Sequence, residues 1–138
     1  MKKFANHCLD RMTFGAKPGD IETFNSLGGN DNARLLAFLD QQLDWSSIDD
    51  SSFDALMAPR GYVTLDKTLE ELWYDHHVNN SVEGFDRNRP IEEMTLYVFA
   101  RATHSKRQLL EVLADFWHNH FNIYGRDYYA QSTFTSWD

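Results

Sequence analysis

Apolar residues recur at helical spacing along most of the chain, and this periodicity most constrains the fold. Leu35, Leu36, Leu39 and Leu43, for example, repeat at intervals of three, four and seven, which places them on one side of a helix. No run of alternating apolar and polar residues indicates a β-sheet. We therefore predict an all-α fold.

Prolines, glycines and capping residues divide the chain into about five to six helices in an irregular bundle. Asn30 or Asp31 can cap one helix, and Asp66 opens another. Ser105 is expected to cap the longest helix, with Gln108 completing a capping box. The predicted helices span about residues 18–27, 31–43, 53–57, 66–76, 90–103 and 106–122.

The C-terminal stretch 125–138 carries aromatic residues without clear helical spacing. These residues are Tyr128, Tyr129, Phe134 and Trp137. Because exposed aromatics usually need a covering surface, the stretch either folds back on the helices or meets another surface. We predict an extended aromatic tail on a single helical domain over residues 1–138.

Composition excludes several classes of protein. Hydrophobic residues make up 42% and aromatic residues 14% of the chain, which argues against disorder. The formal net charge of −8 would repel phosphates, so a nucleic-acid partner is not expected. Cys8 is the one cysteine, which excludes an internal disulfide and a cysteine-rich zinc site.

No membrane segment or leader is expected in this chain. No apolar run approaches the length of a membrane span. The two lysines at the N-terminus are not followed by the apolar region of a secretory signal, because Asn6, His7 and Asp10 interrupt it. The compartment is therefore not predicted.

The stretch DFWHNHFNIYG, residues 115–125, places two histidines near the end of the longest predicted helix. Residues two apart on a helix point about 160° apart, so His118 and His120 occupy different faces. His120 follows Leu113, Phe116 and Trp117 on an apolar stripe. It is expected to be either a partly buried structural histidine or an inward-facing ligand or acid/base group.

His118 shares a polar face with Glu111, Asp115 and Asn122. Carboxylates and an imidazole on one face suit a divalent metal ion, although they equally describe a solvated face. The hypothetical metal ligands are thus Glu111, Asp115, His118 and His120, and His120 is the first candidate for a catalytic role.

Two separated segments resemble the bacterial "domain of unknown function 1800" family. The first is HCLDRMTFGAKPGDIETFNSLG, continuing to LLAFLDQQL, and the second is RATHSKRQLLEVLADFWHNHFN. The matching positions are Arg11, Thr13, Phe14, Gly15, Pro18, Phe38, Leu39, Gln42, Leu43, Arg107, Gln108, Leu109 and residues 116–121.

The resemblance implies a mostly helical protein, often exported, with no generally established activity. It also implies that this chain is the N-terminal portion of a longer architecture, which continues into further helices and an acidic motif rich in asparagine and glutamate. Partners for His118 or His120 would then lie in that remaining part.

Two functional hypotheses follow. One is part of a metal-dependent or acid/base enzyme with a histidine-containing site. The other is a non-enzymatic helical interaction or assembly module. Its partner would be the remainder of the family domain or another protein chain, bound through the aromatic tail.

Overall fold

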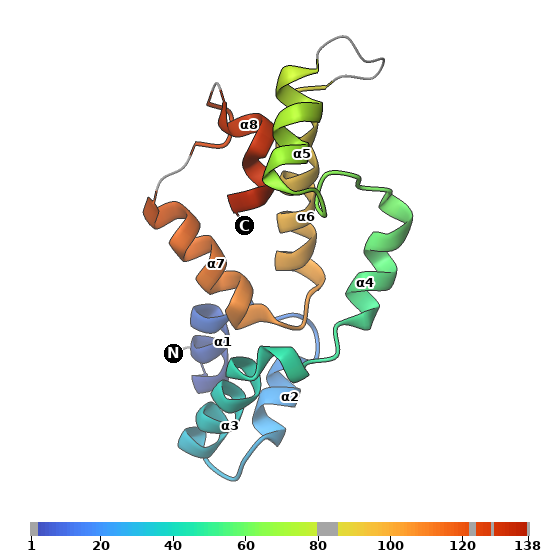
Figure 1. Ribbon diagram of the computed structural model, residues 1–138. Coiled ribbons are helices and arrows are strands. Elements are labelled where there is room, and N and C mark those ends of the chain that lie inside the picture. The colour runs from blue at the N-terminus through green and yellow to red at the C-terminus, as the bar shows by residue number, and fades with distance from the viewer. Residues whose placement is uncertain (1–2, 80–85, 122–123, 128, 138) are drawn as a thin grey trace.

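The computed structural model describes residues 3–79, 86–121, 124–127 and 129–137, and these residues form helices and connecting turns with no strand (Figure 1). The prediction of an all-α fold is confirmed. The elements are α1 (Phe4–Met12), α2 (Asp20–Ser26), α3 (Asp31–Leu43), η1 (Trp45–Ser47), α4 (Ser51–Met57), η2 (Ala58–Arg60), α5 (Leu69–Trp73), η3 (Tyr74–Val78), α6 (Arg89–His104), α7 (Gln108–Phe121), α8 (Ala130–Thr133) and η4 (Phe134–Trp137).

The described residues hold eight α-helices, so the expected number of about five to six is not confirmed. The two helices that the sequence pattern missed are α1 and α8. Helix α1 carries an amphipathic pattern that the sequence interpretation overlooked, with Ala5, Cys8, Leu9 and Met12 at helical spacing. Helix α8 is only four residues long, and a helix this short is set by packing rather than by intrinsic propensity.

Helices α1, α2 and α3 form the first of two small hydrophobic clusters. Phe24 is almost completely buried at its centre, and its ring lies 5.6 Å from that of Phe38. Cys8 and Leu9 are buried beside it. Burial, followed by the nearby Asp31 charge, raises the pKa of the Cys8 thiol.

The second cluster joins α6 to the C-terminal segment. Ile91 and Met94 of α6 are buried against Phe134 of η4. The C-terminal residues 130–137 are helical and fold back on α6, so the expectation of an extended tail is not confirmed (Figure 1). Tyr129 remains more than half exposed. Tyr128 and the Trp137 side chain lie outside the described part.

Helix α5 begins later than predicted. Thr68, rather than Asp66, is the N-cap, and it forms a capping box with Glu71. The helix then continues as the π-helical segment η3. Buried His76 of η3 has its Nδ1 2.9 Å from the carbonyl oxygen of Asp86 and its Nε2 3.2 Å from the ammonium of Lys67.

The corner between α6 and α7 is fastened by side-chain hydrogen bonds. The buried Asp50 carboxylate accepts from the Ser105 hydroxyl at 2.7 Å and from the Lys106 N–H at 2.8 Å. The predicted capping box between Ser105 and Gln108 is wrong: Gln108 donates to the carbonyl oxygens of Ala102 and Ser105. This network orients α7.

Candidate functional site

Helix α7 lies between the two clusters, and its two faces meet different surroundings. We call Glu111, Ala114, Asp115 and His118 the inner face, because these residues line a cavity against α6. We call Leu113, Phe116, Trp117, His120 and Phe121 the outer face, because these residues are exposed. Glu111 and His118 of the inner face are thus buried or half-buried, Asp115 is exposed at the edge of the cavity, and the aromatic face points outward.

The inner face is anchored by one ion pair. Glu111 is buried, and its Oε2 accepts a hydrogen bond from Arg101 Nε of α6 at 2.8 Å. The Arg101 guanidinium also lies 5.2 Å from the centre of the Tyr97 ring. A carboxylate at this depth needs such a partner, since an unpaired buried charge would be strongly destabilising.

The cavity between α6 and α7 has a volume of about 210 Å³. His118 lies at its wall with its ring 5.1 Å from that of Phe134, in an edge-on arrangement. An outer groove of about 490 Å³ adjoins the cavity. Both are lined by Phe14, Val98, Phe99, Ala102 and Asp115.

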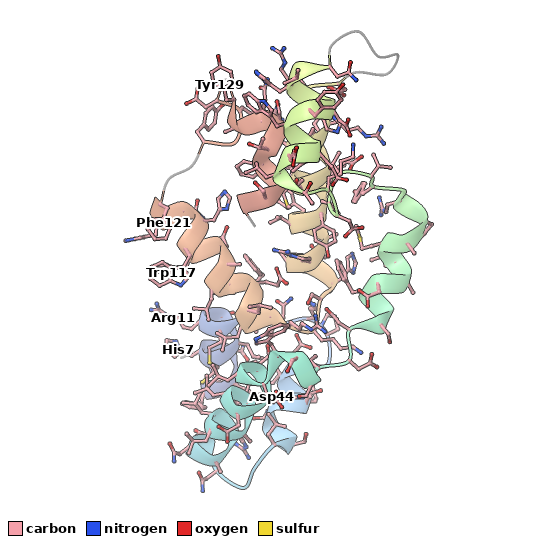
Figure 2. The ribbon with its side chains drawn as sticks, in the orientation of Figure 1. His7, Arg11, Asp44, Trp117, Phe121 and Tyr129 are labelled. Carbon is pink, nitrogen blue, oxygen red and sulfur yellow. The ribbon has the colours of Figure 1, made fainter. Side chains whose placement is uncertain are left out.

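The outer face forms a continuous row of contacting rings on the surface, edge-on between Phe116 and Trp117 and stacked between Trp117 and Phe121. Phe116, Trp117 and Phe121 are each more than half exposed. The Phe116 ring lies 5.2 Å from that of Trp117, which lies 5.9 Å from that of Phe121. Figure 2 shows Trp117 and Phe121 pointing away from the rest of the molecule, with Arg11 of α1 on the same side.

The structure places Glu111, Asp115 and His118 at the cavity and His120 on the opposite face of α7. His120 was expected to face inward and is exposed, with its ring 5.8 Å from that of Phe116. His118, expected on a polar face, is half-buried in the cavity wall. The two histidines thus do not share a site. Asn122 lies outside the described residues.

The four hypothetical metal ligands are only partly brought together. Glu111, Asp115 and His118 line the same cavity, and His120 lies on the opposite face. Within the described part of the chain, no group of three or more His, Cys, Asp or Glu side chains is placed to hold a metal ion. In the same part of the chain, no helix is both long and apolar enough to cross a bilayer.

Three residues of this region were not anticipated from the sequence. Arg101 pairs with Glu111 across the α6–α7 corner, Phe14 closes the cavity from the α1–α2 loop, and Phe134 reaches it from η4. The sequence shows only that Arg101 and Glu111 are ten residues apart. Residues at that separation on one helix do not face each other, so this ion pair cannot be predicted without knowing that the chain turns between α6 and α7.

These features define an all-helical domain with a mostly apolar cavity on one side of α7 and an aromatic surface on the other. The chain belongs to the family described as "Protein of unknown function (DUF1800)", whose family model matches residues 7–137. The resemblance noted in the sequence is thereby confirmed. Comparisons with curated proteins and with solved structures found no significant match.

Proposed function

We propose that this chain is a helical assembly module, and that the outer face of α7 binds another polypeptide. The observation that carries the proposal is the exposure of Phe116, Trp117 and Phe121 on one helix face. Burying each such side chain is worth about 1.5–3 kcal/mol, so a partner that covers them gains substantial binding energy. Aromatic anchors of this kind dominate protein interfaces.

The chemistry of the outer face favours an apolar helical partner. It carries no acidic residue, although the chain as a whole has a net charge of −8. Arg11 and His7 of α1 flank it on the same side (Figure 2). Under this proposal residues 1–138 act as one domain, the N-terminal portion of a larger helical assembly.

Native mass spectrometry of the protein purified from its source tests this proposal. The wild type is expected to be bound to a second polypeptide, and the double variant Trp117→Ser/Phe121→Ser is expected to be a free monomer. The control Leu56→Ser/Tyr74→Ser removes exposed apolar groups from α4 and η3 and should keep the partner. A wild-type monomer, or equal loss of partner in both variants, would contradict the proposal.

A second candidate function is an acid/base or metal-dependent enzyme centred on the cavity. Its support is that His118 and Asp115 line an apolar cavity, a setting in which a histidine can move protons. The catalytic role first considered for His120 passes to His118, because His120 is exposed on the other face. In the metal-dependent form, Asp115 and His118 would contact the ion together with ligands from a partner, because Glu111 is paired with Arg101 and no three such side chains of the described residues are placed to hold an ion.

Titration with Zn²⁺ and Mn²⁺ followed by native mass spectrometry tests the metal-dependent form. We expect the wild type to take up one ion and His118→Ala to take up none, while His104→Ala, which changes an exposed histidine on α6, keeps the ion. Equal uptake of the ion by the wild type and both variants would show that the ion does not bind at His118, which would contradict the metal-dependent form.

A further inference from the structure

We propose that the cavity and groove between α6 and α7 bind a small organic cation, an apolar or aromatic body that carries a protonated amine. The inner cavity is almost entirely apolar, with Met94, Val98 and Phe134 among its walls. The outer groove adjoins it and shares Phe14 and Asp115 with it. This inference does not depend on whether the outer face of α7 is an interface.

Asp115 supplies the charge selectivity. Among the residues that the structure describes, its carboxylate makes no hydrogen bond or ion pair. The other charged pair of the cavity, Arg101 and Glu111, is internally neutralised at 2.8 Å. Lys17 lines the outer groove as well but forms no ion pair with Asp115. The inner cavity taken alone therefore presents one net negative charge, on the exposed Asp115, and Lys17 lines only the adjoining groove.

The aromatic walls favour a cation further. Phe14 and Phe99 line both the cavity and the groove together with Asp115. The faces of aromatic rings attract ammonium groups within about 6 Å. The volume of about 210 Å³ exceeds the roughly 150 Å³ of an apolar cavity known to hold benzene, so a single ring with a short side chain fits.

The probe is 2-phenylethylammonium, compared with the neutral 2-phenylethanol and the anionic phenylacetate. Binding is followed through the methyl signal of Met94, a cavity-lining residue, in protein labelled at methionine methyl groups. We expect saturable binding of the cation with an affinity about tenfold above that of the neutral compound. Phenylacetate should bind more weakly than either.

Asp115→Asn should reduce the preference for the cation to within about twofold. Asp54→Asn, which removes an exposed charge from α4, is the matched control and should leave the preference unchanged. Ala114→Leu, which fills the cavity, should abolish binding of both the cation and the neutral compound. A circular dichroism spectrum like that of the wild type confirms that each variant is folded.

Three results would overturn the proposal. The first is the absence of saturable binding in the wild type. The second is equal affinity for the cation and 2-phenylethanol, which would show that the cavity binds apolar groups without selecting for positive charge. The third is an equal loss of preference in Asp54→Asn and Asp115→Asn, because the diffuse charge of −8 would then explain the attraction.

Discussion

At the scale of single residues, buried carboxylates hold the helices in place. Glu93 of α6 illustrates this: its Oε2 accepts hydrogen bonds from the Val63 N–H, the Thr64 N–H and the Thr64 hydroxyl at 2.7–2.9 Å, and its Oε1 accepts from Arg89 Nε. Burial alone would raise the pKa of Glu93. The hydrogen bonds outweigh burial and hold this pKa below its usual value.

Glu93→Gln should lower the free energy of unfolding by about 1–3 kcal/mol at pH 7, because several charge-assisted hydrogen bonds are lost. A carboxylate with a depressed pKa in the folded state stabilises fully above its unfolded pKa of about 4.3, and this contribution disappears as the pH falls through the folded pKa. The difference between wild type and variant should therefore shrink below about pH 4.

Urea unfolding at pH 7, 5 and 3.5 measures this difference. Glu92→Gln, at the exposed neighbouring position, is the control and should change stability by less than about 0.5 kcal/mol. If Glu93→Gln lowered the free energy of unfolding by the same amount at every pH, the carboxylate charge would not be the cause of the lost stability.

At the scale of the element, α7 is unusual because it buries the carboxylate of Glu111 while its aromatic face is exposed. Glu111 is buried, whereas Trp117 is 52% and Phe121 68% exposed. Most amphipathic helices bury the apolar stripe. We propose a distinct use for each face, a ligand cavity on one side and a binding surface on the other.

Trp117→Ala should change the free energy of unfolding by less than about 0.5 kcal/mol, because the indole makes few buried contacts and alanine favours the helix. Phe134→Ala should cost about 3–5 kcal/mol, because it empties the second cluster. Denaturant unfolding of the monomer compares the two. A loss of several kcal/mol in Trp117→Ala would mean that the outer face is packed within the chain.

Helix α7 also shows which features of the structure could be predicted from the sequence and which could not. Spacing alone separated Glu111, Asp115 and His118 from Phe116, Trp117 and His120, since a helix has a fixed period. It could not say which face is buried. That depends on the hydrogen bonds of Asp50 and Gln42 to the α6–α7 corner, between residues more than fifty positions apart. The helices with strong apolar periodicity, such as α3, were therefore predictable, whereas α8 and the cavity were not.

At the scale of the whole molecule, the described residues form two small hydrophobic clusters rather than a single large core. One centres on Phe24 between α1, α2 and α3, and the other on Ile91, Met94 and Phe134. Helix α7 and its corner connect them (Figure 1).

Because the clusters share no buried residue, substitutions in each should act independently. Phe24→Leu and Ile91→Val should each cost about 0.5–1.5 kcal/mol. The double variant should equal their sum within about 0.5 kcal/mol. Urea unfolding of the three variants provides the comparison, and a coupling above about 1 kcal/mol would indicate one continuous core.

The outward orientation of the aromatic face of α7 is the central claim, and hydroxyl-radical footprinting with mass spectrometry tests it most directly. The chain is labelled at a concentration where native mass spectrometry shows only monomer. We predict fast oxidation of Phe116, Trp117 and Phe121, and slow oxidation of Phe24 and Phe134. Protection of Trp117 as strong as that of Phe24 in the monomer would contradict this orientation, and with it the proposed interface.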